Sequence, residues 1–405
     1  MRLDGAPIAV DSFSHLEAGV LFFCSHAHED HLRGLHSGWD RGPVYCSPLT
    51  AGLLELRWPA LGPLLRPLAL GVVHRLAAES GEGRRDVEVM LVDANHVPGA
   101  VMFVFAGGFG TLLYTGDFRL HPDHAGLRDL PMLQSGLSRI FLDNTFCHPV
   151  FDHPAREAVV SKLLQVVAPR WPCILFVAVY SLGREPLLRD LAQRLGTRVL
   201  APWQRIGSLT AAGILTGEFS EEPAGPLSTS INELRRLGQR GCVWVVKKNQ
   251  LRAAVEHASS SGVPAFGVQP SGWSAVNSNA ARDGPIFADE AADHDAACED
   301  GVWELPYSDH CSFAELVQFL SFLPLAPVTF ITPLPTKTSG KYSYDGVEGV
   351  NVLLQQTGVP AIAYAQRARP GTRGPRGGRG EGPLRLAPWR KRLVARARRV
   401  LPCPG

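Results

Sequence analysis

The chain has 405 residues, of which 45% are hydrophobic and 19% are charged, a composition that excludes an intrinsically disordered protein and allows two packed domains. No apolar run approaches the length of a membrane span, and no basic start followed by a long apolar stretch is present, so we expect neither membrane insertion nor secretion. The net charge of +2 hides an asymmetry, because residues 367–399 hold 12 of the 40 Lys and Arg residues and one of the 38 acidic residues. Eight cysteines without a C-x-x-C pair argue against a thiolate zinc site and indicate a reducing compartment.

From residue 8 to about residue 145, short apolar runs that are typical of buried strands each end in an aspartate or a histidine. Strands that share a sheet and a direction present their carboxyl ends along one edge, so residues at these ends can converge although they are far apart in sequence. We therefore expect a metal site at such an edge. The residues that end the runs are Asp11, His26, His96, Asp117 and Asp143.

From Pro149 onward the pattern changes to alternating helix and strand, which predicts an α/β insertion. Pro154 opens a helical run with one apolar face, and a strand follows at residues 173–180. The next helix ends at Gly196, and residues 197–201 form another strand.

Residues 271–301 show no periodicity and are predicted to form a long surface loop. The chain then returns to a strand, and the capping box of Ser312 and Glu315 predicts the start of a helix. His310 therefore occupies a strand-to-helix turn. Beyond about residue 365 the chain is rich in Gly, Pro and Arg, and disorder is expected there.

The segment from His26 to His31 packs three imidazoles into six positions between an apolar strand and a helical run. Residues two apart on an extended segment point the same way, so His26 and His28 can share one cation while Asp30 and His31 face a neighbouring one. Imidazole nitrogens and carboxylate oxygens suit Zn²⁺. The competing interpretation is a solvated polar turn.

His96 and Asp117 carry little weight alone, since a histidine after a strand is commonly a core or loop residue and Gly116-Asp117 is an ordinary turn signal. Their expected place at the same sheet edge favours a role as metal ligands. The two oxygens of Asp117 can bridge two metals, and His310 can complete the second site.

Five short motifs resemble those of the β-CASP metallo-β-lactamase nucleases, in particular the DNA cross-link repair group that contains Apollo and Artemis. They are HAHEDH, DANH, TGDFRL, LDNTFC and PYSDH, and the similarity covers roughly residues 6–330. The resemblance implies an α/β fold, a metallo-β-lactamase αββα sandwich with an inserted α/β β-CASP domain. The expected boundaries are 1–148 for the first part of the sandwich, 149–301 for the insertion, 302–365 for the return to the sandwich and 366–405 for a basic tail.

The same resemblance implies roles for the site residues. Asp11 and Asp143 match family acidic positions that support the site, although both can also be simple strand-end caps. Asp30 is a candidate general base that orients the attacking water, and zinc, as one or two ions, lowers the pKa of that water to about 7. The implied ligands are His26, His28, His96 and Asp117 for the first metal, and Asp30, His31, Asp117 and His310 for the second.

The run from Tyr180 to Glu185 lies at another strand-to-helix junction, where free backbone N–H groups favour an anion. It is similar to the segment that forms a pocket for the DNA 5′-phosphate in the Apollo-like exonuclease branch, which implies phosphate binding by Ser181, Gly183 and Arg184. An ordinary turn is the alternative. Trp273 lies in a segment that also resembles a family motif, and it can either stack on a base or pack in the core.

One position departs from the family pattern. A histidine expected in the third strand of the insertion is replaced by Trp244, so either His257 substitutes for it or the surroundings of Asp143 are altered. In the tail, residues 384–388 are similar to peptides that dock on telomere-protecting proteins, but Leu384 stands where an aromatic residue is expected.

Taken together, these patterns predict a nuclear, zinc-dependent 5′-to-3′ DNA exonuclease. Its expected substrates are 5′-phosphorylated ends, single- or double-stranded, in interstrand cross-link repair or telomere end processing. The alternatives are an Artemis-like structure-specific endonuclease, an RNA-processing relative, and a catalytically weakened DNA- or telomere-binding scaffold.

Overall fold

The computed structural model describes residues 1–14, 18–80, 83–180, 182–225, 231, 241–274, 301–333 and 346–364. The chain forms two units, residues 1–365 and residues 366–405, and the second unit lies outside the described residues. The basic tail, including residues 384–388, and most of the loop expected at 271–301 therefore stay predictions. None of the helices in the described part combines the length and apolar character needed to span a bilayer.

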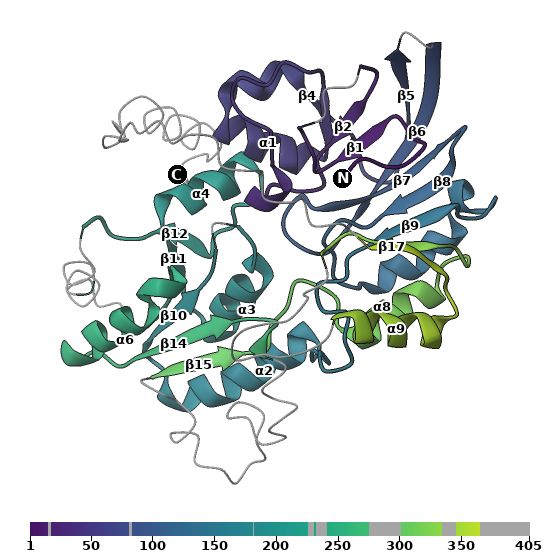
Figure 1. The fold of residues 1–405 in the computed structure, drawn as a ribbon. Coiled ribbons are helices and arrows are strands. Elements are labelled where there is room, and N and C mark those ends of the chain that lie inside the picture. Colours follow the sequence, from purple (N-terminus) through teal and green to yellow (C-terminus); the bar gives the residue numbers. More distant parts are fainter. Residues whose placement is uncertain are drawn as a thin grey trace, which may run out of the picture. The chain divides into compact units, whose positions relative to one another are not determined.

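Two stacked sheets form the inner layers of the sandwich (Figure 1). The smaller sheet is parallel throughout and the larger one is mixed. The smaller sheet has the order β1 (Ile8–Val10), β2 (Leu21–Phe23), β3 (Val44–Cys46) and β4 (Leu65–Pro67). The larger sheet has the order β17 (Ala361–Tyr364), β16 (Val328–Phe330), β9 (Arg139–Leu142), β8 (Gly110–Tyr114), β7 (Val101–Gly107), β6 (Gly83–Asp93) and β5 (Val73–Ser80).

The two sheets pack face to face through aromatic side chains. The Phe23 ring of β2 lies 5.3 Å from the ring of Phe103 and 4.9 Å from that of Phe105, both on β7. The alternate residues on β7, Met102 and Val104, point to the opposite face and join a second core. A strand alternates its side chains between two faces, so an uninterrupted apolar run such as β7 fits a sheet that is covered on both sides.

Helices cover the outer face of each sheet. Helix α1 (Pro48–Arg57) packs Leu54 against the core that contains Phe22 of β2. On the other side, α8 (Phe313–Ser321) and α9 (Gly346–Thr357) pack against the larger sheet, where Phe319 shares a core with Val104. The resulting αββα order confirms the predicted metallo-β-lactamase fold.

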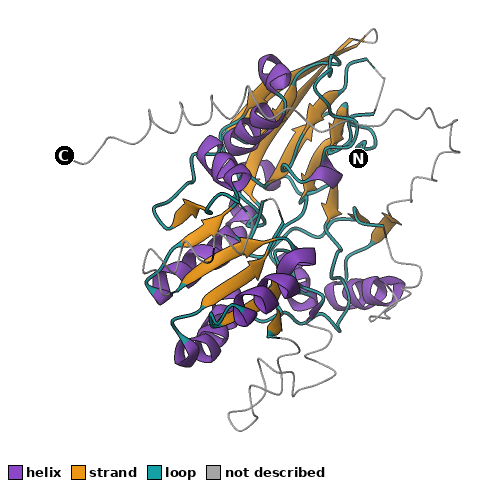
Figure 2. Ribbon diagram, turned by 90° about the vertical axis from the view of Figure 1, so that its left-hand side faces the viewer, coloured by secondary structure: helices purple, strands orange, loops and turns teal. Residues whose placement is uncertain are grey.

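The insertion is a separate parallel sheet with helices on both faces (Figure 2). Helices α2 (Arg156–Val167) and α3 (Glu185–Leu195) contribute to one core, and α6 (Leu251–Ser260) contributes to the core on the other face. The strand order is β12 (Phe219–Glu221), β11 (Val199–Ala201), β13 (Cys242–Val246), β10 (Ile174–Ala178), β14 (Ala265–Pro270) and β15 (Val302–Leu305). Helix α4 spans Trp203–Ala211.

One strand lies on the other side of an expected boundary. The return to the sandwich was expected at residue 302, but β15 begins at Val302 and pairs with β14 of the insertion sheet. A short apolar strand carries no local mark of the sheet that it joins, so the pattern alone does not assign it. The capping box of Ser312 and Glu315 is present as predicted and starts α8.

Gly349 of α9 gives a test of this packing, because an added Cβ would overlap the carbonyl oxygen of Cys147 and lie 2.8 Å from Cα of His148. Alanine is normally the better helix former. Here we expect Gly349→Ala to lower the free energy of unfolding by about 1–3 kcal/mol, because the backbone that it meets cannot move aside.

The measurement is denaturant unfolding, with Gly126→Ala as the control, since a Cβ on Gly126 would meet no described atom within 4 Å. Equal stability of the two variants would show that α9 shifts freely.

Candidate metal centre

The sandwich brings one group of four donors together. His26, His28, His96 and Asp117 each offer an atom, and these atoms lie within 4.8 Å of one another. Each residue follows the carboxyl end of a strand: the two first histidines follow β2, His96 follows β6 and Asp117 follows β8. The convergence predicted from the strand ends is therefore seen in the structure.

The ring nitrogens of this group point toward one another and toward Asp117, and Nε2 of His96 lies 3.4 Å from Nδ1 of His28. Nε2 of His26 and Nε2 of His96 both lie 3.8 Å from Oδ2 of Asp117. His26 Nε2 is buried and has no hydrogen-bond partner among the described residues. Burial lowers the pKa of His96 to about 3 and that of His26 well below its usual range, so both rings are neutral with a free lone pair. Three neutral imidazoles and a carboxylate fit a divalent cation.

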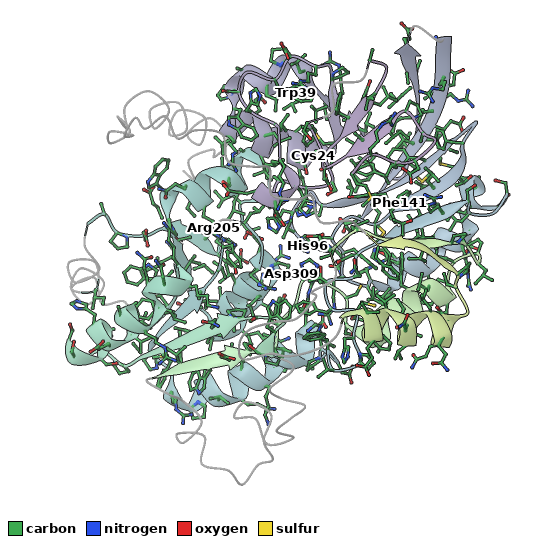
Figure 3. The ribbon with its side chains drawn as sticks, in the orientation of Figure 1. Cys24, Trp39, His96, Phe141, Arg205 and Asp309 are labelled. Carbon is green, nitrogen blue, oxygen red and sulfur yellow. The ribbon has the colours of Figure 1, made fainter. Side chains whose placement is uncertain are left out.

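A shell of hydrogen bonds orients these ligands. Ser25 donates from N and Oγ to the two oxygens of Asp11, at 2.7 and 2.6 Å, and its Oγ lies 3.0 Å from Nδ1 of His26. His96 Nδ1 donates to the carbonyl of Asp309 at 2.9 Å (Figure 3), which fixes its tautomer and leaves Nε2 for the site. Asp11 is thus joined through Ser25 to the ring of His26, and its supporting role stays a prediction.

A second, smaller donor group consists of Asp117, Asp143 and His310. His310 Nδ1 lies 2.8 Å from Oδ2 of Asp143, and Nε2 lies 3.9 Å from Oδ2 of Asp117. Burial acts to lower the pKa of His310, but the carboxylates of Asp143 and Asp117 raise it to about 9. Asp143 is held in turn by Thr145, which donates from N and Oγ1 at 2.9 and 2.6 Å.

Two residues expected in the second site are placed differently. Asp30 is 67% exposed, and its nearest ionic contact is His31 Nε2 at 3.8 Å. His31 bonds through Nδ1 to Asp11 at 2.9 Å and lies 3.2 Å from Asp117. Neither residue belongs to the donor groups found in the described part of the chain. The role of Asp30 as a general base stays a prediction.

The position of the expected histidine is occupied by a buried tryptophan. Trp244 of β13 lies in the insertion core against Phe176, and its Nε1 donates to Glu222 at 2.8 Å. In the described part of the chain, His310 contacts Asp143. Substitution by His257 and altered surroundings of Asp143 both stay predictions.

The expected phosphate segment lies directly against the metal centre. Gly183 and Arg184 both have left-handed backbones, with φ of 106° and 67°, and Ser181 lies outside the described residues. Arg184 Nη1 lies 2.7 Å from Oδ2 of Asp309, the residue whose carbonyl holds His96. Asp309 also pairs with Arg156 Nη2 at 3.1 Å.

The ring of Trp273 packs against other aromatic rings. Its ring centroid lies 5.0 Å from that of Phe146 and 5.5 Å from that of Phe151, both at steep angles. His153 joins the same cluster and donates from Nε2 to the carbonyl of Gly272 at 2.8 Å. The packing interpretation of Trp273 is thus supported by geometry.

Comparison with known proteins agrees with this geometry. A family model described as DNA repair metallo-beta-lactamase matches residues 243–333. The chain is 36% identical over 326 residues to the 5′ exonuclease Apollo of Gallus gallus, covering 79% of this chain and 61% of the relative. It is 33% identical over 336 residues to the 5′ exonuclease Apollo of Danio rerio, covering 81% and 51%. The chain is thus similar to DNA repair metallo-β-lactamases.

A protein named for DNA cross-link repair is also similar. The DNA cross-link repair protein SNM1 of Arabidopsis thaliana is 27% identical over 343 residues, covering 80% of this chain and 63% of the relative. The chain thus spans between half and two thirds of the length of these relatives. The matched family model and the four-donor group together indicate a metal-binding site.

Several residues that hold this site were missed from sequence. Asp309 stands inside the quoted PYSDH motif, next to His310, and its spacing could have drawn notice. Arg119, inside TGDFRL, is buried and donates to the carbonyl of Ser308 at 2.9 Å. Arg156 gives no local signal, because its partner Asp309 is distant in sequence.

Metal content tests the donor groups. We expect Asp117→Ala to lose bound metal, because Asp117 belongs to both groups, and Asp143→Asn to keep the ion held by the other four donors. The measurement is elemental analysis of the purified proteins. Asp30→Ala is the control and should retain metal. Loss of metal from this control to the same extent as from Asp117→Ala would contradict the assignment.

His153 gives a prediction of pH dependence away from the ligands. Burial lowers its pKa to about 4, and Nδ1 has no hydrogen-bond partner among the described residues. The unfolded chain therefore takes up this proton first as the pH falls, and stability is lost below the ordinary pKa of histidine. Relative to His153→Gln, the native protein should lose about 1 kcal/mol between about pH 7.5 and about pH 5.5.

Denaturant unfolding of both proteins at the two pH values measures this difference, and the metal-site histidines cancel because both proteins contain them. If the free energy of unfolding changed with pH equally in both proteins, His153 would be protonated as readily in the folded state as in the unfolded state.

Proposed function

We propose that this chain is a zinc-dependent 5′-to-3′ DNA exonuclease that acts on 5′-phosphorylated ends. The observation that supports this most is the group of three imidazoles and one carboxylate beside the Asp143–His310 pair. Neutral imidazole nitrogens and a carboxylate oxygen favour zinc over magnesium or calcium, which prefer oxygen ligands. The relatives named 5′ exonuclease Apollo support the direction of digestion.

The residues divide the work of phosphodiester hydrolysis. His26, His28, His96 and Asp117 would hold the ion, which supplies Lewis-acid polarisation of the phosphodiester and activation of water at neutral pH. Asp143 holds His310 by its Nδ1, so Nε2 faces the site and can pass a proton to the departing sugar oxygen. With two ions bound, Asp117, Asp143 and His310 would instead hold the second.

The substrate preference is proposed from the charges around Asp309. Arg156 and Arg184 both pair with this single carboxylate, which leaves one positive charge in excess next to the ligand His96. A terminal phosphate suits such a place, and planar guanidinium groups bind phosphate in a bidentate manner. Action on interstrand cross-links or telomere ends in the nucleus, and docking of residues 384–388 on a telomere-protecting protein, are part of the same proposal.

The test is digestion of otherwise identical single strands with a 5′-phosphate or a 5′-hydroxyl end. We expect rapid shortening of the phosphorylated strand and a markedly slower reaction on the hydroxyl end. His310→Ala should digest the phosphorylated strand at a rate at least about 100-fold lower than that of the native protein.

Matched substrates separate the other functions. Opening of covalently closed hairpin DNA would favour the Artemis-like endonuclease, and digestion of the matched RNA would favour RNA processing. Equal rates on the two 5′ ends would reject the phosphate preference, and absence of hydrolysis with metal bound would favour the scaffold.

A further inference from the structure

A buried ion pair lies beside the metal centre without belonging to it. Glu185 is the first residue of α3 and is 8% exposed, and Arg205 of α4 is 3% exposed. Nη2 of Arg205 lies 2.5 Å from Oε1 of Glu185. Burying two charges is costly even when they are paired, so a pair in this position calls for a further role.

The pair holds the backbone of a short segment, which we call the rim and define as Tyr180, Leu182, Gly183 and Arg184. Arg205 donates to the carbonyl of Tyr180 at 2.8 Å and to that of Gly183 at 2.5 Å. Glu185 accepts from the N–H of Gly183 at 3.2 Å. The left-handed backbone at Arg184 is unfavourable for a residue with a side chain, and these bonds help to hold the segment in that conformation.

The rim contacts the metal centre at one end and solvent at the other. Arg184 pairs with Asp309, whose carbonyl orients the ring of His96. A Cβ on Gly183 would lie 3.1 Å from Cγ1 of Val97, next to the ligand His96. At the other end, the ring of Tyr180 is 75% exposed, more than any other large apolar side chain in the described part of the chain.

Tyr180 lies close to the metal centre along the chain. It is three residues before Gly183, so the two Cα atoms are at most about 11 Å apart. An aromatic ring beside a phosphodiesterase site can stack on any base, because every base has a π-face. Fixing its backbone beforehand reduces the entropy lost on binding.

We propose that Tyr180 stacks on a base near the end of the bound strand, and that Glu185 and Arg205 are positioning residues that fix this ring beside the metal centre. The inference rests on the proposed nuclease function. It adds a stacking contact that binds the base rather than the phosphate. Arg184, which we propose to bind the terminal phosphate, lies on the same segment.

The first experiment compares the native protein with Tyr180→Ala and Tyr180→Phe on 5′-phosphorylated single strands, either intact or with an abasic site at one of the first three positions. We expect Tyr180→Ala to raise KM about 10-fold with little change in kcat, and Tyr180→Phe to behave as the native protein. On the strand that lacks the stacked base, native protein and Tyr180→Ala should have the same KM.

Two results would overturn the stacking contact: an unchanged KM in Tyr180→Ala, or an equal loss in Tyr180→Phe. Failure of the nuclease proposal is seen separately, as absence of digestion by the native protein. Stacking is then read from fluorescence anisotropy with the same intact and abasic strands, where equal affinities of the native protein and Tyr180→Ala overturn it.

The second experiment tests positioning with Arg205→Lys and Glu185→Gln, alone and combined with Tyr180→Ala. We expect each to raise KM on the intact strand several-fold, and this increase to shrink in the Tyr180→Ala background, because contacts that act through one group are not additive. Equal increases in both backgrounds would overturn the positioning role.

The matched control is Asp190→Asn, which removes an exposed ion pair with Arg194 on the same helix α3, 2.7 Å apart, and should leave KM unchanged. Metal content and thermal unfolding of every variant show whether a loss comes from the rim or from general unfolding.

Discussion

The carboxylate of Asp117 is the group on which the site depends. Its Oδ2 lies between 3.2 and 3.9 Å from ring nitrogens of four histidines. Burial alone would raise the pKa of Asp117, but the charges of His31 and His310 hold it well below its usual range. A buried carboxylate needs positive charge nearby, whereas imidazoles crowded together resist protonation. A divalent cation meets both needs, because it takes the lone pairs of neutral rings and neutralises the carboxylate.

The insertion shapes this site although it supplies none of the donors in the two groups found among the described residues. Its influence passes through Asp309, whose carbonyl orients His96 and whose carboxylate pairs with Arg156 of α2 and with Arg184 before α3. Each contact joins an element of the insertion to a ligand-bearing loop of the sandwich. A change at the insertion helices can therefore reach the donor His96 through Asp309 without touching it.

Local patterns predicted the parts of the molecule that local physics determines. Strand ends marked by Asp and His located the ligands, and Ser312 with Glu315 located the start of α8. Residue spacing predicted the side to which Asp30 points but not how deeply its side chain is buried, so its exposure to solvent could not be foreseen. The pair of Glu185 and Arg205 was missed because two isolated charges twenty residues apart form no pattern; only the fold shows that they share a buried contact.

Arg184 illustrates why charge must be counted over the cluster rather than residue by residue. Its guanidinium is already paired with Asp309 and lies over the ring of Tyr307 at 5.3 Å, which by itself suggests a structural role. Arg156 pairs with the same carboxylate and is anchored independently, by bonds to Asn95 Oδ1 at 3.1 Å and to the Ser308 carbonyl. If Arg184 turns toward a phosphate, Asp309 keeps Arg156 and is not left as an unpaired buried charge. The second arginine thus makes it possible for the first to bind substrate while His96 stays in place.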